Sequence, residues 1–472
     1  MTKILMVGSE AAPFAKTGGL ADVLGALPAA LHELGDEVAV LLPRYGSIPL
    51  AELERIYDSL EIWLGPARYE TSVYRTGRGA TYYFLDCPQL YDRPGLYGDA
   101  EGDYPDNHIR FAVLSRAALE IARRIFRPHI LHCHDWQAGL TPVYKKTLFA
   151  QDPTFLAMRT LFTIHNLGYQ GLFPKQALPQ IGLDETAFVP EGIEFFGRVN
   201  LLKGGLKYSD ALTTVSKAYA REIQTSRYGF GLDGVLRARA RVLTGILNGA
   251  DYSEWNPETD RWIAANYSAD DLSGKRACKR DLLAEFGLPE TAMEQPVLGV
   301  VARLTSQKGA DLIAEVAPDL PAEDAYLVVL GSGDAKYETQ FAKLALAFPG
   351  RICVRLGYDN QLAHKIEAGS DMFLMPSQYE PCGLNQIYSL RYGTPPVVRA
   401  TGGLDDTIEE DTGFKFQEYS AKALLDCIRT AVAAYRDRDC WVERMRRCMR
   451  KDFSWNISAK EYSALYRRLI GS

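Results

Sequence analysis

The chain has 472 residues, of which 47% are hydrophobic and 24% are charged, a composition that is typical of folded proteins and argues against disorder. Its net charge is -6, and its 53 basic and 59 acidic residues are interspersed, so we expect no binding of nucleic acid. The length exceeds what one hydrophobic core supports and predicts two large domains.

The N-terminal segment, MTKILMVGSEAAPF, has only a four-residue apolar run before Gly8, which is too short for a signal peptide. No other run reaches membrane-spanning length, so we expect no membrane partner. The eight cysteines include no CxxC pair and are typical of reduced thiols, which favours a cytoplasmic location. A metal site in HCHD (132–135) is not expected, because Cys133 of a strand would face away from His132 and His134.

Near-continuous apolar runs alternate with helical patterns through the first half of the chain. Such runs are typical of parallel strands that are covered on both faces. A helical pattern over 20–35 ends at Gly35, a predicted C-cap. The expected strands are 3–9, 37–43, 81–87, 129–135, 159–166 and 211–216.

A second series of strands begins after a polar stretch at 248–262, and helical patterns at 339–348 and 360–369 lie between its members. The alternation in both halves predicts two doubly wound α/β domains. The expected strands of this series are 296–303, 325–333, 351–357, 370–377 and 395–400.

The predicted domain boundaries place residues 1–245 in an N-terminal domain and 246–455 in a C-terminal domain. Residues 456–472 form an amphipathic helix that we expect to pack back across the boundary. Because ligands bind beyond the carboxyl ends of the strands in such sheets, we expect both domains to face one interdomain cleft.

The string TGGLAD at 17–22 recurs as TGGLDD at 401–406, and each copy is predicted to be a loop that leads into a helix. The paired glycines Gly18 and Gly19 would let a ligand approach the backbone. A helix that starts after them would direct its N–H groups at an anion such as phosphate, and Lys16 would add a full positive charge. The alternative is a tight turn with a surface lysine, with Asp22 favouring the helix dipole.

Two basic residues, Arg303 and Lys308, lie in VARLTSQKGADL (301–312), directly after the first strand of the second domain. Arginine offers a bidentate fork to phosphate oxygens and lysine a movable charge, so together they could neutralise a diphosphate leaving group. The alternative is two solvated side chains in a loop.

Glu380 comes after another strand and directly before a Pro-Cys-Gly turn and a helical pattern. A carboxylate there could accept hydrogen bonds from sugar hydroxyls or stabilise positive charge on a sugar ring. Its alternative role is capping the following helix. Asp135 and His165 also end strands, at the ligand-facing edge of the first domain, although each could be a satisfied structural group.

Seven motifs in order, KTGGLADV, HDWQAGL, TIHNLGYQG, ILNGADYSEWNP, RLTSQKGADL, SQYEPCGLNQ and RATGGLDDTI, closely resemble those of bacterial glycogen synthase and plant-type starch synthase. These are retaining glycosyltransferases with the GT-B fold of two Rossmann-like domains. The resemblance implies transfer of glucose from ADP-glucose to the non-reducing 4-hydroxyl of an α-1,4-glucan such as glycogen. It also implies that ADP is released and that neither a metal nor an organic cofactor is needed.

The resemblance further implies roles for individual residues. Lys16, Gly18 and Gly19 would bind the sugar nucleotide, Arg303 and Lys308 the diphosphate, and Glu380 the transferred glucose. His165, Asn166, Asp135 and Asn248 would line the glucose pocket, while Asp22 and Tyr97 would lie on the acceptor side. Tyr358 would stack on adenine, Cys382, Gly383 and Leu384 would support phosphate or sugar, and Thr401 and Gly402 would close over the nucleotide sugar.

One position departs from the wider group of retaining GT-B enzymes, which often have a second glutamate eight residues after the first. Here that position is Tyr388, so we expect no carboxylate on the ribose from it. For the retained configuration we favour front-face attack assisted by the departing phosphate over a covalent glucosyl intermediate.

Three alternatives remain open at this point. The chain could be a UDP-sugar-dependent transferase on the same fold, because the preference for ADP follows from resemblance alone. A pyridoxal phosphate phosphorylase is disfavoured by the chain length. A glucan sensor without catalysis is a further alternative, although the named polar residues are all present. The sequence leaves the oligomeric state, the preferred glucan length and any allosteric control undefined.

Overall fold

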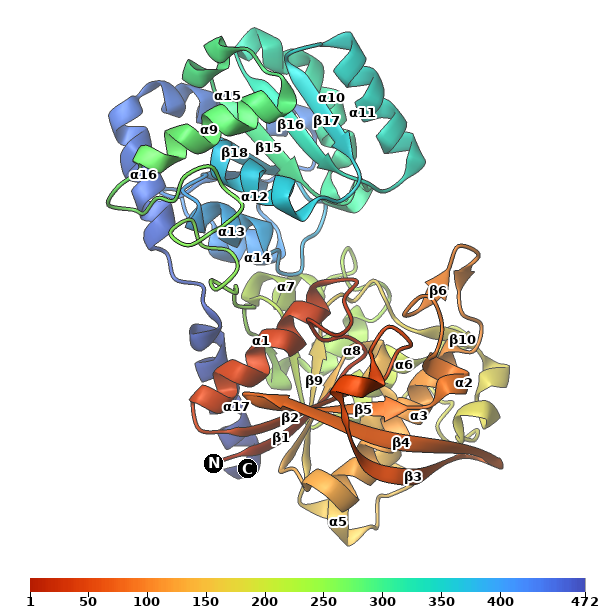
Figure 1. The fold of residues 1–472 in the computed structure, drawn as a ribbon. Coiled ribbons are helices and arrows are strands. Elements are labelled where there is room, and N and C mark those ends of the chain that lie inside the picture. The colour runs from red at the N-terminus through yellow and green to blue at the C-terminus, as the bar shows by residue number, and fades with distance from the viewer. Residues whose placement is uncertain (472) are drawn as a thin grey trace. The chain divides into compact units, whose positions relative to one another are not determined.

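The computed structural model describes residues 1–471, in which the chain divides into two compact units. The first unit comprises Met1–Val215, Ala220–Gly249 and Trp455–Ser472, and the second comprises Ser216–Tyr219 and Ala250–Ser454. Each unit is an α/β domain built around a central sheet, as the ribbon in Figure 1 shows. The predicted pair of Rossmann-like domains is therefore confirmed.

The first unit contains a nine-stranded sheet in the order β14-β13-β9-β8-β1-β2-β5-β4-β3. The strands from β14 to β5 are all paired in parallel, and all six strands predicted for this half are present. The bounds in sheet order are β14 Leu243–Gly245, β13 Ala211–Thr214, β9 Arg159–Ile164, β8 Ile130–His134, β1 Lys3–Val7, β2 Glu37–Pro43, β5 Ala80–Asp86, β4 Ala67–Arg78 and β3 Glu54–Leu64.

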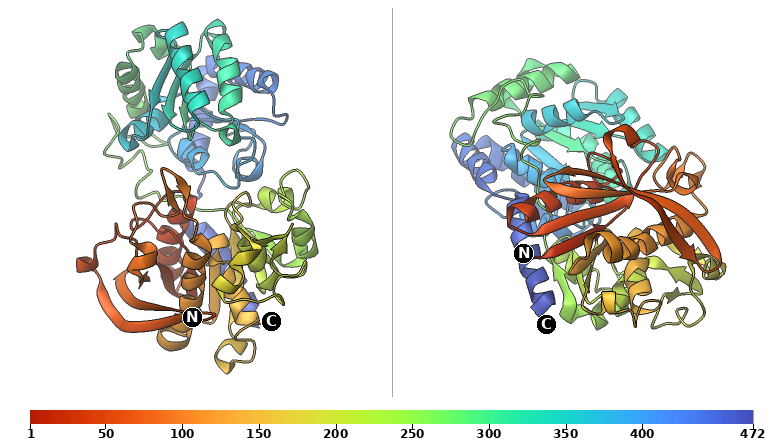
Figure 2. Two further views of the ribbon diagram at one scale, coloured as in Figure 1. Left: turned by 90° about the vertical axis from the view of Figure 1, so that its right-hand side faces the viewer. Right: turned by 60° about the horizontal axis from the view of Figure 1, so that its bottom comes forward.

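The short strand β14 was not predicted, and neither were β3 and β4, which extend this sheet in antiparallel pairing. The latter two form a long twisted ribbon at one edge of the unit (Figures 1 and 2). In β3 the buried residues Leu60, Ile62 and Leu64 alternate with exposed ones, which is typical of a strand with one covered face. Two small sheets complete the unit, one of β10 (Leu172–Pro174), β12 (Arg198–Asn200) and β11 (Glu194–Phe195), and one of β6 (Gly98–Asp99) and β7 (Gly102–Asp103).

The terminal helix α17 (Trp455–Gly471) belongs to the first unit and lies beside α1 (Gly19–Glu33) (Figure 1). Tyr462 and Tyr466 of α17 are fully buried, and Ser463 donates a hydrogen bond to Asp36 over 2.7 Å. The unit's other helices are α2 Pro88–Tyr91, α3 Asn107–Ile121, α4 Leu140–Lys146, α5 Pro153–Leu156, α6 Leu201–Tyr208 and α8 Asp233–Ala238, while α7 (Lys217–Glu222) lies where the chain passes between the units.

The second unit contains a six-stranded parallel sheet in the order β17-β16-β15-β18-β19-β20. Alternate residues of its strands enter separate cores: Leu327 belongs to one hydrophobic cluster and Val328 to the other, as expected of a doubly wound sheet. The bounds are β17 Ile352–Leu356, β16 Tyr326–Gly331, β15 Val297–Val301, β18 Met372–Met375, β19 Pro396–Arg399 and β20 Phe414–Phe416.

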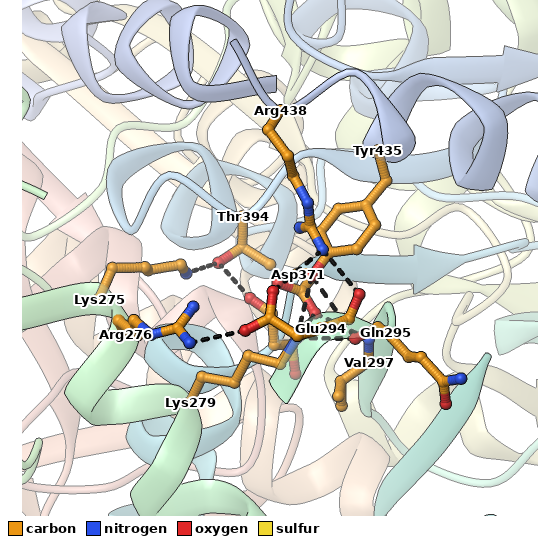
Figure 3. Close-up of polar contacts among 11 residues, drawn as sticks. Lys275, Arg276, Lys279, Glu294, Gln295, Val297, Asp371, Thr394, Tyr435 and Arg438 are labelled. Atoms are coloured by element: carbon orange, nitrogen blue, oxygen red, sulfur yellow. Dashed lines mark hydrogen bonds and ion pairs between the residues drawn. The ribbon is translucent and has the colours of Figure 1, made fainter. Parts of the chain in front are cut away.

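Helices pack on this sheet, and a cluster of hydrogen-bonded polar residues joins them to the amino ends of the strands (Figure 3). Lys279 donates hydrogen bonds to the Asp371 carboxylate (2.7 Å), the Gln295 carbonyl (2.7 Å) and the Tyr435 hydroxyl (3.0 Å). Asp371 also accepts from the backbone N–H of Val297, at the start of β15. The helices are α9 Ser273–Phe286, α10 Ala310–Val316, α11 Ala335–Ala347, α12 Asn360–Gly369, α13 Asn385–Arg391, α14 Gly402–Thr407, α15 Ala421–Arg436 and α16 Arg438–Arg450.

This cluster stabilises the end of the sheet opposite to the strand ends at which ligands are expected. The carboxyl ends of the strands, and the loops that follow them, are therefore left to carry the site. Within residues 1–471, no helix combines the length and the hydrophobicity needed to cross a membrane.

Candidate active site

In the first unit, polar residues follow the carboxyl ends of three neighbouring strands, β9, β8 and β1. Glu10 lies in the loop after β1, Asp135 directly after β8, and His165 directly after β9. Because parallel neighbours end at the same edge of a sheet, these side chains share one edge.

Glu10 organises the loop that carries the first TGGL motif, a role that the motif analysis missed. Its carboxylate is buried and accepts hydrogen bonds from the backbone N–H groups of Thr17 and Gly18 and from the Thr17 hydroxyl. The Tyr97 hydroxyl donates to the same carboxylate and also lies 2.7 Å from the Ser9 Oγ. Two loop amides are thus already bound by the protein's own carboxylate.

Lys16 and Asp22 form an ion pair of 2.6 Å across this loop, with the lysine side chain 56% exposed. Gly18 is the N-cap of α1 and has an extended backbone, with φ of -156°. A Cβ atom built on Gly18 or Gly19 meets no described atom within 4 Å. Neither backbone strain nor packing within residues 1–471 therefore requires glycine at these two positions.

Asp135 has a strained backbone, with φ of 55° and ψ of -175°, a conformation that is almost restricted to glycine and costs about 1–3 kcal/mol. Its carboxylate accepts a hydrogen bond of 2.7 Å from the backbone N–H of His165. Burial raises the pKa of Asp135 to about 7, although part of the residue is exposed. Hydrogen bonds from the backbone of His165 and Asn166 lower this pKa, but they do not offset the effect of burial. This carboxyl group therefore titrates near neutral pH.

His165 lies beside a second histidine, His134 of β8, with His134 Nδ1 and His165 Nε2 3.0 Å apart. Burial lowers the pKa of His165 to about 3 and that of His134 well below its ordinary value. Both rings are therefore neutral at physiological pH, so His165 can form hydrogen bonds but does not act as a cation. Asn166 accepts from the N–H of Gly168 over 3.0 Å, which fixes the turn after β9.

Asn248 is 5% exposed, and its Oδ1 has no hydrogen-bond partner among the described residues. A buried carbonyl oxygen without a partner is uncommon in native proteins. No hydrogen bond links Asn248 to His165 or Asp135 in the described part of the chain, so the structure does not join it to them directly.

In the second unit, Lys308 and Glu380 form a 2.7 Å ion pair, in which the Glu380 side chain is 6% exposed. Lys308 follows β15 and Glu380 follows β18, and these two strands are neighbours in the sheet. The Ser377 hydroxyl also donates to Glu380, over 3.0 Å. Glu380 therefore does not cap α13, whose N-cap residue is Leu384; it holds the charged end of Lys308 in place.

The second TGGL copy packs tightly against the Glu380 loop. Gly402 has φ of 46°, and a Cβ atom built on it would lie 1.9 Å from the Glu380 carbonyl oxygen. A Cβ on Gly403 would lie equally close to the Cys382 carbonyl oxygen, and the Gly403 N–H donates to the Glu380 carbonyl over 3.0 Å. Glycine is needed in this copy so that two segments of backbone can approach each other.

Arg399, at the end of β19, is a further residue that the motif analysis missed. It is 4% exposed and donates to the backbone carbonyls of Ser377 (2.9 Å), Gln378 and Gln417 (3.2 Å). A buried guanidinium group thereby fixes the backbone on which Glu380 is carried.

Comparison with known proteins identifies the family to which the chain belongs. The model of the starch synthase catalytic domain matches residues 3–238, and that of glycosyl transferases group 1 matches residues 287–447. The glycogen synthase of Koribacter versatilis is 53% identical over 474 residues, and that of Anaeromyxobacter dehalogenans is 51% identical over 478 residues, each covering at least 98% of both chains. The chain belongs to the glycogen and starch synthase family.

Solved structures agree with this membership. The catalytic domain of starch synthase IV from Arabidopsis thaliana, bound to ADP and acarbose, matches over 100% of both chains with a TM-score of 0.91 and 32% identity. Sucrose-phosphate synthase from Thermosynechococcus elongatus, at 18% identity and a TM-score of 0.63, shares the fold. This member of the synthase family is therefore a GT-B glycosyltransferase, as the sequence predicted.

The remaining residues expected in the synthase site lie in loops that follow strands of the second unit. Arg303 is exposed, and Tyr358 is 79% exposed, with its hydroxyl donating to Asn360 over 2.9 Å. Gly383, with φ of 72°, follows the buried Cys382 in the turn that leads to Leu384 and α13. Gln386 donates to the carbonyls of Cys382 and Gly383 and so holds this turn.

Tyr388 of this synthase is 8% exposed and stacks on Trp255, with ring centroids 4.3 Å apart and planes 5° apart. The ring of His364 stacks on Trp255 as well, at 3.8 Å. The position of the second glutamate in the wider group is thus part of an aromatic core.

Proposed function

We propose that the chain is a glycogen synthase that transfers glucose from ADP-glucose to the non-reducing 4-hydroxyl of an α-1,4-glucan and retains the anomeric configuration. The observation that carries this proposal is the Lys308–Glu380 pair at the carboxyl ends of β15 and β18, intact and supported by Ser377. A binding protein that had lost catalysis would have no need to preserve it. The names of the full-length relatives and the ADP in the starch synthase structure support the choice of donor.

The proposal assigns several residues to the nucleotide part of the donor. Lys308 and Arg303 neutralise the diphosphate with a point charge and a bidentate fork, and Lys16 contributes from the loop before α1. Tyr358 offers an exposed ring on which adenine stacks. The loops that complete this side comprise Gly18, Gly19, Cys382, Gly383, Leu384, Thr401 and Gly402.

The glucose lies against the strand ends of the first unit in the same proposal. His165 is neutral, so it exchanges a hydrogen bond with a sugar hydroxyl without adding charge. Asn166, Asp135 and Asn248 contribute polar groups, and Asn248 has a buried oxygen with no partner in the described residues. Glu380 contacts the transferred sugar in this proposal, while Asp22 and Tyr97 bind the acceptor.

The positive charges of Lys308 and Arg303 support a mechanism in which the acceptor attacks the same face of the glucose that ADP leaves. The bond between the glucose C1 and the phosphate oxygen breaks with its electron pair leaving on ADP. The acceptor 4-hydroxyl forms the new bond to C1 on the same face, and its proton passes to the departing phosphate. Lys308 and Arg303 stabilise the negative charge that develops on the phosphate. A covalent glucosyl-enzyme trapped on any carboxylate would overturn this mechanism.

The reaction is tested by incubating the full-length protein with ADP-glucose and a maltooligosaccharide of defined length, followed by mass spectrometry. We expect products longer by one or more glucose units, each sensitive to α-amylase. An unchanged oligosaccharide, with ADP-glucose intact, would favour the sensor alternative.

We also propose that the enzyme works in the cytoplasm, where its eight cysteines remain reduced.

A further inference from the structure

Three buried histidines form a column inside the first unit, and only one of them is at the proposed sugar site. His132 and His134 project from the same side of β8, with ring centroids 4.0 Å apart. His134 in turn meets His165, whose ring centroid lies at 5.3 Å. Beyond these contacts His132 is held by both ring nitrogens: Nδ1 lies 2.8 Å from the Tyr466 hydroxyl of α17, and Nε2 lies 2.6 Å from the Thr163 hydroxyl.

The contact between His134 Nδ1 and His165 Nε2 requires one proton to lie between two neutral rings. Two arrangements are possible. Either His134 donates from Nδ1, and its Nε2 is a bare lone pair, or His134 carries its proton on Nε2 and accepts from His165. The choice decides whether His165 Nδ1, the ring nitrogen that does not face His134, carries a proton.

The surroundings of His134 Nε2 distinguish the two arrangements. This atom is fully buried and has no hydrogen-bond partner among the described residues. A buried N–H without a partner loses a strong hydrogen bond to water, whereas an unused acceptor lone pair is tolerated more often. The arrangement in which His134 donates from Nδ1 is therefore the stable one.

We propose that His134 is a positioning residue that fixes the tautomer of His165: it donates from Nδ1 to His165 Nε2, so that neutral His165 carries its proton on Nδ1. His165 then presents an N–H donor, and not an acceptor, to a hydroxyl oxygen of the transferred sugar. This use of His165 rests on the proposed function. His132, held by Tyr466 and Thr163, packs on His134 and keeps its ring plane fixed.

The tautomer is measured directly on the full-length protein without substrate. Protein labelled with ¹⁵N in its histidines is studied by NMR, in which protonated and bare ring nitrogens have distinct shifts, and His165→Gln assigns the signals. We expect His165 to be protonated on Nδ1 in the wild type and in His134→Asn. Protonation of His165 on Nε2 in the wild type would overturn the proposal.

The matched pair His134→Asn and His134→Asp tests the consequence for catalysis. The asparagine amide can donate from the position of Nδ1, whereas an ionised aspartate only accepts and forces the proton of His165 onto Nε2. We expect His134→Asn to keep kcat/KM within about 3-fold, and His134→Asp and His134→Leu to lower it on the order of 10-fold to 100-fold. Equal losses in the asparagine and leucine variants, or an aspartate variant as active as the asparagine one, would contradict the proposal.

A control separates this effect from the loss of any buried histidine. His364 of the second unit is fully buried and bonded to Asp260 over 2.7 Å. We expect His364→Asn and His364→Leu to lower thermal stability but to have equal kcat/KM. The NMR measurement needs no donor substrate, so it determines the tautomer of His165 even if the wild type transfers no glucose. Absence of glucose transfer would refute the proposed function alone.

Discussion

At the level of single residues, Lys308 and Glu380 form an ion pair to which we assign a role in turnover. Glu380 is 4% exposed, so its charge is stabilised mainly by Lys308 and Ser377. Removal of one partner from a buried ion pair leaves an uncompensated charge and costs about 3–5 kcal/mol. Effects on stability and on catalysis therefore have to be measured separately at this pair.

We expect Lys308→Ala to lower kcat on the order of 100-fold or more, because in the proposed mechanism the lysine stabilises charge that develops on the leaving phosphate. Steady-state kinetics with ADP-glucose and glycogen measure this. The double variant Lys308→Ala with Glu380→Gln removes both charges, so it should recover thermal stability without recovering turnover. A Lys308→Ala enzyme with normal kcat and a raised KM would show that the lysine only binds the donor.

Asp135 gives a prediction about pH. Its pKa is about 7 in the folded protein, above the ordinary value of 3.8, so the folded state binds this proton more tightly than the unfolded state. Ionisation above pH 7 therefore costs stability, and the cost disappears as the pH falls toward 4. Asparagine has nearly the same shape as aspartate, so it leaves the backbone strain unchanged and keeps an oxygen for the His165 N–H, but it carries no such ionisation cost.

We expect Asp135→Asn to melt several degrees above the wild type at pH 8, since 1 kcal/mol corresponds to roughly 2–4 °C in domains of this size. The difference should shrink steadily toward pH 4. Thermal denaturation across this pH range is the measurement, and a constant difference at every pH would show that the carboxyl group does not titrate as inferred.

At the scale of elements, the two TGGL loops have the same sequence for different physical reasons. The second copy needs glycine because Gly402 adopts positive φ and touches the Glu380 backbone. The first copy meets neither condition at Gly18. The shared string therefore predicted two loops before helices correctly, but it did not indicate that one copy is fixed by internal packing.

This contrast predicts opposite outcomes for two equivalent substitutions. Gly402→Ala should destabilise the protein by about 2 kcal/mol or more, because alanine is strained at positive φ and its Cβ meets a backbone carbonyl. Gly18→Ala should change the free energy of unfolding by less than about 1 kcal/mol. If the first loop binds the donor, Gly18→Ala should still raise KM for ADP-glucose. Equal melting temperatures for the two variants would contradict this account.

Much of the element structure could be predicted, because buried parallel strands are continuous apolar runs. The β3–β4 pair was missed because its strands are half-exposed and alternate, so they lack such a run. Asp135 and His165 could be named as site candidates because they lie at the ends of predicted strands. Arg399 and His134 were missed because their partners are distant in sequence, and only the fold brings them together. Glu10 was missed although Thr17 and Gly18 are close in sequence, because the sequence does not show that this loop folds back on the carboxylate.

At the scale of the whole molecule, the last helix completes the unit in which the chain begins. Tyr466 of α17 contacts His132 of β8, and Ser458 donates to the Leu247 carbonyl. The first unit therefore cannot reach its final packing until the C-terminal segment is available.

We expect truncation after Ser454 to destabilise the first unit selectively. Hydrogen exchange should show lost protection in β1 and β8, with β15 and β16 still protected. Tyr466→Phe is a milder matched change that removes one buried hydrogen bond, worth about 1–2 kcal/mol. Unchanged protection of β8 in the truncated chain would refute this role of α17.

One measurement tests both the donor and the acceptor of the proposed reaction. The full-length protein is incubated with glycogen and with radiolabelled ADP-glucose or UDP-glucose, and label that enters α-amylase-sensitive polymer is counted. We expect efficient incorporation from ADP-glucose and little from UDP-glucose. Incorporation from UDP-glucose alone would contradict the nucleotide assignment, and none from either donor would contradict the assignment of the chain as a glycogen synthase.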